Sequence, residues 1–348
     1  MDTIGLDLHK RESQLCIMSA NGELTERRIV TSRDRFTAVL ADRQKARILV
    51  EASTESEWVA QHLENLGHEV IVADPNYAPM YATRSRRIKT DKRDARTLAE
   101  ALRVGAYRKA HRVSSARRHV RAELAVREAL VRTRTRYISL AKALVRRDGL
   151  RVQGSESEKV AKRIAELDLS ENLAAELLPL FQVLAPINDE IEGADRRIAQ
   201  LSRDDHEVAL LATAPSIGPI TASAIVSTVD DITRFDSAHQ FEAFLGLVPG
   251  ERSSGEKRRV GKITKAGNSR VRYLLVEAAW RIMRSKNNDE TRALRSWALL
   301  IAVRRGKRIA IVALARRLAG ILYAMWRDDT SYSATKLRMP RPIVAKAG

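Results

Sequence analysis

The chain has only one cysteine among its 348 residues, Cys16, so it can form neither an intramolecular disulfide nor a cysteine-based zinc cluster. Its seven histidines include no pair at His-x3-His spacing on a predicted helix, so a bound metal would be held by oxygen ligands. No uninterrupted apolar run approaches the length of about 18 residues that spans a bilayer, and residues 3–8 resemble a strand instead of a signal peptide. We therefore expect a cytoplasmic protein that does not enter a membrane.

Acidic residues are too few to balance the basic ones. The sequence has 62 Lys and Arg against 43 Asp and Glu, which gives a formal net charge of +19. This excess favours a polyanionic partner, DNA or RNA, over a membrane surface. The length is enough for two or three domains of about 100 to 200 residues each.

The first part of the chain, residues 1–110, has the pattern of an α/β domain. Three strands joined by tight turns are followed by alternating helices and strands, which predicts a layered fold with helices packed on a sheet. Cys16 lies in the second strand, where we expect a buried thiol. The predicted strands cover residues 3–8, 13–18, 23–30, 48–51 and 69–73, and the predicted helices cover residues 34–45, 55–66 and 90–102.

Four acids of this domain lie in or at the ends of predicted elements. Asp7 lies inside the first strand, where a buried carboxylate without a partner would be costly, and Glu51 ends the fourth strand. Asp91 and Asp94 are three residues apart and share one face of the helix that begins near residue 90. If these elements converge, the four carboxylates could hold one or two Mg²⁺ ions for displacement at phosphorus. Each acid alone could equally be structural, as a helix-start or strand-end charge.

Residues 111–205 are predicted to be helical, with coiled-coil character. Apolar residues recur every seven positions in a helix over residues 117–147, whose other faces carry arginines such as Arg121 that are either solvated or in contact with nucleic acid. A second apolar stripe follows over residues 173–201, where Pro179 and Pro186 predict that a regular helix begins only near Pro186. The two stripes could form a hairpin within one chain or a dimer seam, and the pattern does not choose.

Residues 206–330 are predicted to form a mainly helical domain. Residues 210–225 have the pattern helix, tight Pro/Gly turn, helix, which resembles a helix-hairpin-helix; Ser216 and Gly218 of the turn would direct backbone N–H groups at a phosphate. Two further helices are expected over residues 270–284 and 306–327, and residues 331–348 are expected to form a poorly ordered tail.

The basic segment 251–270 carries Ser253 and Ser254 directly before a glycine. On composition alone it would be a solvated basic loop. A serine hydroxyl attacks a phosphodiester only with help from a base, a metal or a cationic environment. Its cations, which we interpret as phosphate-positioning groups, are Arg252, Lys257, Arg258, Arg259, Lys262 and Lys265.

Several motifs together resemble the DEDD transposases of bacterial insertion sequences. The blocks are IGLDLHK at residues 4–10, VEAST at 50–54, VADPN at 72–76 and KTDKRDAR at 89–96, followed by SSGEKRR at 253–259 and ITKAGN at 263–268. The resemblance implies a RuvC-like N-terminal domain with a ribonuclease H fold. It also implies a metal tetrad for Mg²⁺ or Mn²⁺, formed by Asp7, Glu51, Asp91 and Asp94, and a serine nucleophile at Ser254, with its neighbour Ser253 as second choice.

The same resemblance implies partners and a reaction. It predicts donor and target DNA, a structured bridge RNA that guides the choice of DNA, and a homo-oligomer that is a dimer or a tetramer in the synaptic complex on the bacterial nucleoid. The expected reaction is strand cleavage and exchange through a phosphoserine intermediate. Two other hypotheses remain: a metal-dependent endonuclease of the Holliday-junction type with water as nucleophile, and a non-catalytic nucleic-acid scaffold.

Overall fold

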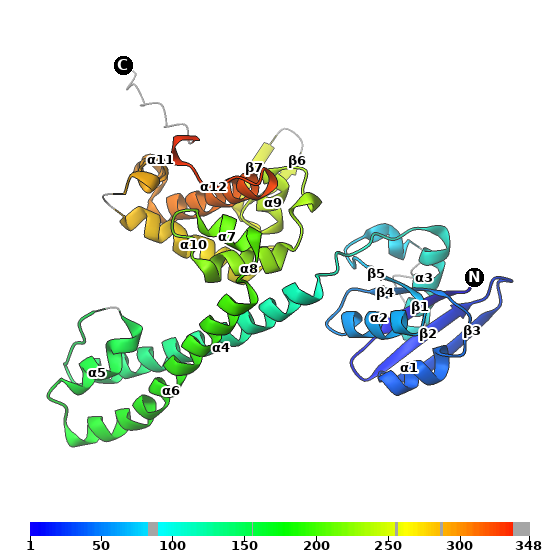
Figure 1. Cartoon of the computed structure of the whole chain (residues 1–348), viewed down its shortest axis with the longest axis horizontal. Coiled ribbons are helices and arrows are strands. Elements are labelled where there is room, and N and C mark those ends of the chain that lie inside the picture. The colour runs from blue at the N-terminus through cyan, green and yellow to red at the C-terminus, as the bar shows by residue number, and fades with distance from the viewer. Residues whose placement is uncertain (83–89, 155, 255–256, 286–287, 337–348) are drawn as a thin grey trace, which may run out of the picture. The chain divides into compact units, whose positions relative to one another are not determined.

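The computed structural model describes residues 1–82, 90–154, 156–254, 257–285 and 288–336. They divide into two compact units, Met1–Arg112 and Val113–Gly348, which are considered one at a time (Figure 1). The first is an α/β unit and the second is largely helical, so the predicted combination of an α/β domain with a helical region is confirmed.

The first unit is built on a five-stranded sheet in the order β3-β2-β1-β4-β5. The first three strands form an antiparallel meander, and β4 and β5 extend the sheet in parallel with β1. This is the strand arrangement of a ribonuclease H-like fold, as predicted. The strands are β1 (Thr3–Leu8), β2 (Glu12–Met18), β3 (Leu24–Val30), β4 (Arg47–Glu51) and β5 (Glu69–Ala73).

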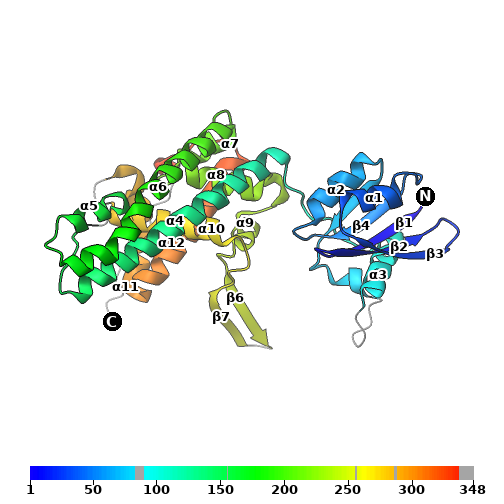
Figure 2. The same ribbon diagram turned by 90° about the horizontal axis from the view of Figure 1, so that it is seen from below.

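Helices cover both faces of this sheet (Figure 2). Successive residues of a strand point to opposite faces, so Ile4 and Leu6 of β1 pack into the core under α1 (Arg33–Leu40) and α2 (Ser56–Asn65). Gly5 and Asp7 therefore point to the other face, which is covered by α3 (Asp91–Val104). Cys16 is fully buried on that face, as predicted, together with Met18 and two alanines of α3. A short turn, η1 (Ala78–Tyr81), contacts the same helix.

The second unit begins with two long helices, α4 (Ser115–Arg147) and α6 (Glu171–Leu201), which pack along each other within one chain. Their far end is closed by η2 (Ser157–Lys159) and α5 (Val160–Ala165). The prediction that a regular helix begins only near Pro186 is wrong, because α6 runs through both prolines. Pro179 and Pro186 are seven residues apart on the exposed face, so water can solvate the carbonyl groups that lose their N–H partners.

Most of the remaining helices of the second unit pack against α12 (Lys307–Arg327), whose Leu314, Leu318 and Leu322 are buried in the larger core. Among the described residues α12 is also the one helix long and apolar enough to cross a membrane by length and composition. Three helices of this unit were not predicted from the sequence: α5, α9 (Ala238–Phe244) and α11 (Asp289–Arg305). The other elements are α7 (His206–Ala212), α8 (Pro219–Val229), η3 (Ile232–Arg234), α10 (Ser269–Arg284) and η4 (Ala334–Lys336).

The basic segment that composition alone would make a loop is a two-stranded antiparallel hairpin, β6 (Pro249–Ser254) and β7 (Lys257–Ile263). Its base is tight: the Thr264 N–H donates to the Val248 carbonyl at 2.9 Å, and a Cβ atom on Gly267 would lie 1.9 Å from the Phe244 backbone oxygen. The base is thus fixed to the end of α9 by backbone contacts. The expected poorly ordered tail falls mostly on residues 337–348, outside the described part.

Candidate active site

The sheet geometry brings the four predicted acids to one place in the first unit. β1 and β4 are parallel neighbours, with Leu6 opposite Val50, so Asp7 and Glu51 lie next to each other at the carboxyl ends of these strands. Leu49, two residues before Glu51, packs against α3, and the two-residue period therefore places Glu51 on the α3 face as well.

The other two acids come from the first turn of α3. Thr90 caps this helix by accepting the Arg93 N–H, so Asp91 is the first helical residue and Asp94 lies one turn further on. Glu51 is additionally held by a hydrogen bond of 2.6 Å that the Tyr81 hydroxyl donates to its Oε1. The structure thus gathers the four predicted carboxylates, and it adds Tyr81, which the sequence analysis missed.

The close approach of α3 to the sheet depends on Gly5. A Cβ atom at this position would lie 2.0 Å from the backbone oxygen of Ala95 and 2.4 Å from the backbone nitrogen of Ala99. Both are backbone atoms of α3, so no change of rotamer could relieve the contact. A glycine two residues before Asp7 therefore sets the distance between the strand acids and the helix acids.

The electrostatic environment of Asp7 is suited to a bound cation. Burial, followed by repulsion from Asp94, Asp91 and Glu51, raises the pKa of Asp7 to about 6, although the nearby His9 lowers it. The Asp7 Oδ2 atom is buried and accepts no hydrogen bond from the described residues. A cation among these groups would offset the repulsion and bind the buried oxygen.

His9 lies beside the acids, although the sequence analysis gave it no role. Its Nε2 atom is 3.2 Å from Asp7 Oδ2 and 3.6 Å from Asp91 Oδ1. One ligand atom from each of the three residues lies within 4.8 Å of the others. The carboxylate oxygens are hard donors of the kind that Mg²⁺ and Mn²⁺ accept, so the residues present fit a divalent cation.

Ser253 and Ser254 lie in the second unit, at the end of β6, where Ser254 is paired with Lys257 of β7. The side chains of residues 252–260 are outside the described part, so the assigned roles of Arg252, Arg258, Arg259 and both serines stay predictions. Lys262 is exposed on β7, and Lys265, two residues after the end of β7, is exposed with a left-handed φ of 57°. Lys262 thus lies on the hairpin that carries Ser254, and Lys265 lies just beyond the base of this hairpin.

The predicted phosphate-binding turn lies between α7 and α8. Ser216 has a left-handed φ of 64°, Gly218 is the N-cap of α8 and Pro219 is its first residue. This is the expected helix, tight turn and helix, and the first N–H groups of α8 have no partner within their own helix. The contact of Ser216 and Gly218 with nucleic acid stays a prediction.

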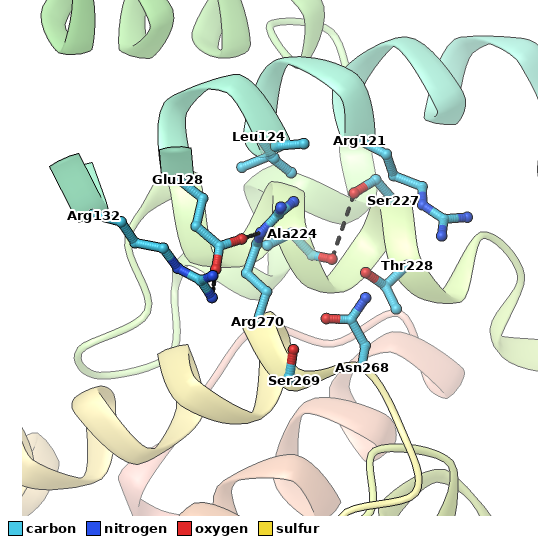
Figure 3. A pocket seen from close by; sticks show the side chains of 11 residues that line it. Arg121, Leu124, Glu128, Arg132, Ala224, Ser227, Thr228, Asn268, Ser269 and Arg270 are labelled. Atoms are coloured by element: carbon cyan, nitrogen blue, oxygen red, sulfur yellow. Dashed lines mark hydrogen bonds and ion pairs between the residues drawn. The ribbon is translucent and has the colours of Figure 1, made fainter. Parts of the chain in front are cut away.

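A polar pocket of about 390 Å³ in the second unit was not predicted (Figure 3). It lies between α4, α8 and the start of α10. Glu128 forms ion pairs with both Arg132 and Arg270, which fixes these two arginines on one wall. Arg121 is exposed on another part of the wall and has no ion-pair partner in the part of the chain that the structure describes. Its remaining polar lining consists of Ser227, Thr228, Asn268 and Ser269.

Comparison with known proteins gives consistent matches along the chain. The family model described as transposase IS116/IS110/IS902 family matches residues 208–295, and a DEDD transposase model matches residues 4–147. A probable family 20 transposase of Pseudomonas aeruginosa is 30% identical over 347 residues, covering 95% of this chain and 98% of that protein. The transposase of insertion sequence element IS1111A from Coxiella burnetii is 26% identical over 340 residues, covering 94% and 90%. For the transposase of IS1328 from Yersinia enterocolitica the identity is 27% over 334 residues, covering 95% and 98%. The chain therefore belongs to the IS116/IS110/IS902 family of insertion-sequence transposases.

Proposed function

We propose that this transposase cleaves and rejoins DNA through a covalent phosphoserine at Ser254, with a divalent cation held by Asp7, Glu51, Asp91 and Asp94. The observation that carries the proposal is the convergence of the four carboxylates where β1 and β4 end and α3 begins, around the partly buried Asp7, which the other three acids repel. Such a cluster gains no stability from its own charges, so its presence favours a role in chemistry.

In the proposed step, the Ser254 hydroxyl oxygen bonds to phosphorus while the bond from phosphorus to the leaving strand oxygen breaks. The hydroxyl proton passes to a base, and the leaving oxygen takes up a proton. Attack by a hydroxyl of another DNA strand then reverses these changes, releases the serine and joins the strands. Because each step exchanges one phosphoester for another, strand exchange needs no external energy source.

The protein's own groups would assist this reaction by charge and position. A divalent cation bound by the four carboxylates would supply positive charge to the phosphate oxygens. Lys262 and Lys265, with the predicted cations of the hairpin, would hold the phosphate near Ser254. Tyr81 would keep Glu51 in position through its hydrogen bond.

The nucleic-acid partners follow from charge and from family. The net charge of +19 suits the binding of long polyanions, and Arg121 in the polar pocket offers one further phosphate contact. We propose donor and target DNA as substrates, a structured bridge RNA as guide, and a homo-oligomer as the active assembly, all in the cytoplasm on the nucleoid.

The test is to trap the covalent intermediate. The full-length protein is incubated with labelled donor and target DNA, the RNA that co-purifies with it, and Mg²⁺, then denatured, digested and analysed by mass spectrometry. We expect a DNA adduct on Ser254 that is absent from Ser254→Ala and from a reaction with EDTA. Ser253→Ala is the matched control, because it changes the neighbouring hydroxyl and should retain the adduct.

The other outcomes identify the rival functions. Cleaved DNA with free ends and no attached protein would indicate an endonuclease that uses water, as in Holliday-junction resolution. Full transposition by Asp7→Ala would mean that the acids are structural and that the chain is a scaffold. A co-purifying RNA of discrete sequence supports the guide, whereas its absence from an active preparation would contradict it.

A further inference from the structure

His9 is the one nitrogen donor beside the carboxylates in the described part of the first unit. It follows β1 directly and its side chain is about half exposed, yet its Nε2 atom turns back to both Asp7 and Asp91. Its backbone is anchored, because the Thr31 hydroxyl donates a hydrogen bond of 2.8 Å to the His9 carbonyl oxygen. Thr31 is itself bonded to Ser13 of β2 at 2.6 Å. The backbone is thus fixed, while the ring keeps freedom to adjust.

The two distances from His9 are too long for the strongest kind of ion pair. An imidazolium that donates to a carboxylate is expected at about 2.7–2.9 Å. The distances here are 3.2 Å to Asp7 and 3.6 Å to Asp91, both from the same nitrogen. One N–H cannot point well at two acceptors on different elements. A simple counter-ion role for His9 therefore explains the arrangement poorly.

The same distances suit three ligands around one cation. In an octahedral site with metal–ligand bonds of about 2.1 Å, neighbouring ligand atoms are about 3.0 Å apart and opposite ones about 4.2 Å. The His9 nitrogen lies 3.2 and 3.6 Å from the two carboxylate oxygens, and all three atoms lie within 4.8 Å of one another. Shifts of a few tenths of an ångström in side chains that are partly exposed would complete this part of a coordination shell.

We propose that His9 is a direct ligand of the divalent cation, so that the site combines one imidazole nitrogen with carboxylate oxygens. This rests on the proposed cation site and changes its chemistry. The cysteine and histidine content of the sequence predicts oxygen ligands only, which suit Mg²⁺ well. An imidazole ligand favours transition metals, so the site should prefer Mn²⁺ over Mg²⁺ more strongly than an all-oxygen site would.

The test detects the metal–nitrogen bond without relying on activity. Mn²⁺ is added to the full-length protein, its binding is measured by electron paramagnetic resonance, and pulsed measurements search for coupling to a directly bound ¹⁴N nucleus. We expect such coupling in the wild type, replacement by ¹⁵N coupling after labelling with ¹⁵N-histidine, and loss of coupling in His9→Ala. The Mn²⁺ affinity of His9→Ala should fall about 10- to 100-fold, with a smaller fall for Mg²⁺.

Two further variants locate the signal. His62→Ala removes a histidine of α2, on the opposite face of the sheet, and should leave affinity and coupling unchanged. Asp7→Asn should abolish Mn²⁺ binding. A wild type that binds Mn²⁺ through Asp7 but shows no nitrogen coupling would overturn the role of His9 and leave the carboxylate site standing. A wild type that binds no Mn²⁺, or binding that survives Asp7→Asn, would overturn both.

Discussion

Gly5→Ala should separate the acids of the strands from the acids of the helix. The new Cβ would lie 2.0 Å from the Ala95 backbone oxygen, whereas ordinary contact begins at 3.4 Å. Helix α3 must therefore move away from β1 by about 1.4 Å, the difference between these distances. Asp91 and Asp94 would move with the helix, while Asp7 would stay with the strand.

The expected effects are of two kinds. Forcing one methyl group against a packed backbone costs about 1–3 kcal/mol of stability. A displacement of about 1 Å among catalytic groups can lower a rate about 100-fold, and metal sites tolerate only about 0.2 Å. We therefore expect Gly5→Ala to fold with reduced stability and to lose most of its cation affinity and strand cleavage.

Cys16 supplies the assay, because it is the only thiol in the chain and lies beneath α3 beside Ala95 and Ala99. The thiol is fully buried, and burial raises its pKa to about 11, so alkylation of the wild type at pH 8 should be slow and require opening. A cost of about 1–3 kcal/mol in Gly5→Ala should accelerate alkylation roughly 5- to 150-fold.

Gly105→Ala is the matched control at the other end of α3. Gly105 has a left-handed φ of 72°, and a Cβ atom there would meet nothing within 4 Å. Its cost is backbone strain of about 1–2 kcal/mol, without pressure on the sheet. It should lower stability but keep the cation affinity. Wild-type alkylation and cation affinity in Gly5→Ala would refute the spacing role of Gly5.

Two further predictions concern charge. Because the folded-state pKa of Asp7 is raised to about 6, Asp7 holds its proton more tightly in the folded than in the unfolded chain between pH 3.8 and 6, and its contribution to stability in EDTA falls as pH rises through this window. Asp7→Asn should then be more stable by about 3 kcal/mol at pH 7.5 and by about half as much at pH 5, measured by hydrogen exchange of β1; an equally stable or less stable variant would contradict this. Arg121→Ala should lower the magnitude of the slope of log affinity against log salt by about 0.7–0.9, measured by fluorescence anisotropy with single- and double-stranded oligonucleotides; an unchanged slope would show that the pocket binds no phosphate.

The sequence was most informative where hydrophobic periodicity was strong. β1 and β5 have the predicted bounds, and α3, α10 and α12 begin within one residue of the predicted start. The sequence pattern left open whether Asp7 and Glu51 converge; the parallel pairing of β1 with β4 brings them together. That the acids of α3 lie beside Asp7 and Glu51 could be expected only from the resemblance of the combined motifs to a known family.

The features that were missed depend on long-range contacts. The strands β6 and β7 carry mostly Arg, Lys and Ser, so they lack the alternation of apolar residues that marks a strand. The roles of Gly5, His9 and Tyr81 depend on neighbours about 20 to 90 residues away, and no local pattern contains that information. Helix α11 has an apolar periodicity too weak to predict.

If Ser254 is the nucleophile, a small rotation of the β6–β7 hairpin at its base would produce a large displacement of the serine. Ser254 lies five residues beyond Pro249, the first residue of β6. At about 3.4 Å per residue, it is roughly 17 Å from the base of the hairpin. The close backbone contact at Gly267 makes the base of the hairpin the pivot. A rotation of about 10° about this pivot would move Ser254 by about 3 Å, which is enough to change the distance between its hydroxyl and a phosphorus atom from reactive to unreactive. The position of the Ser254 hydroxyl is then set by the molecule that binds the hairpin. If bound nucleic acid holds this two-stranded hairpin in place, Ser254 would reach the phosphate only after correct assembly.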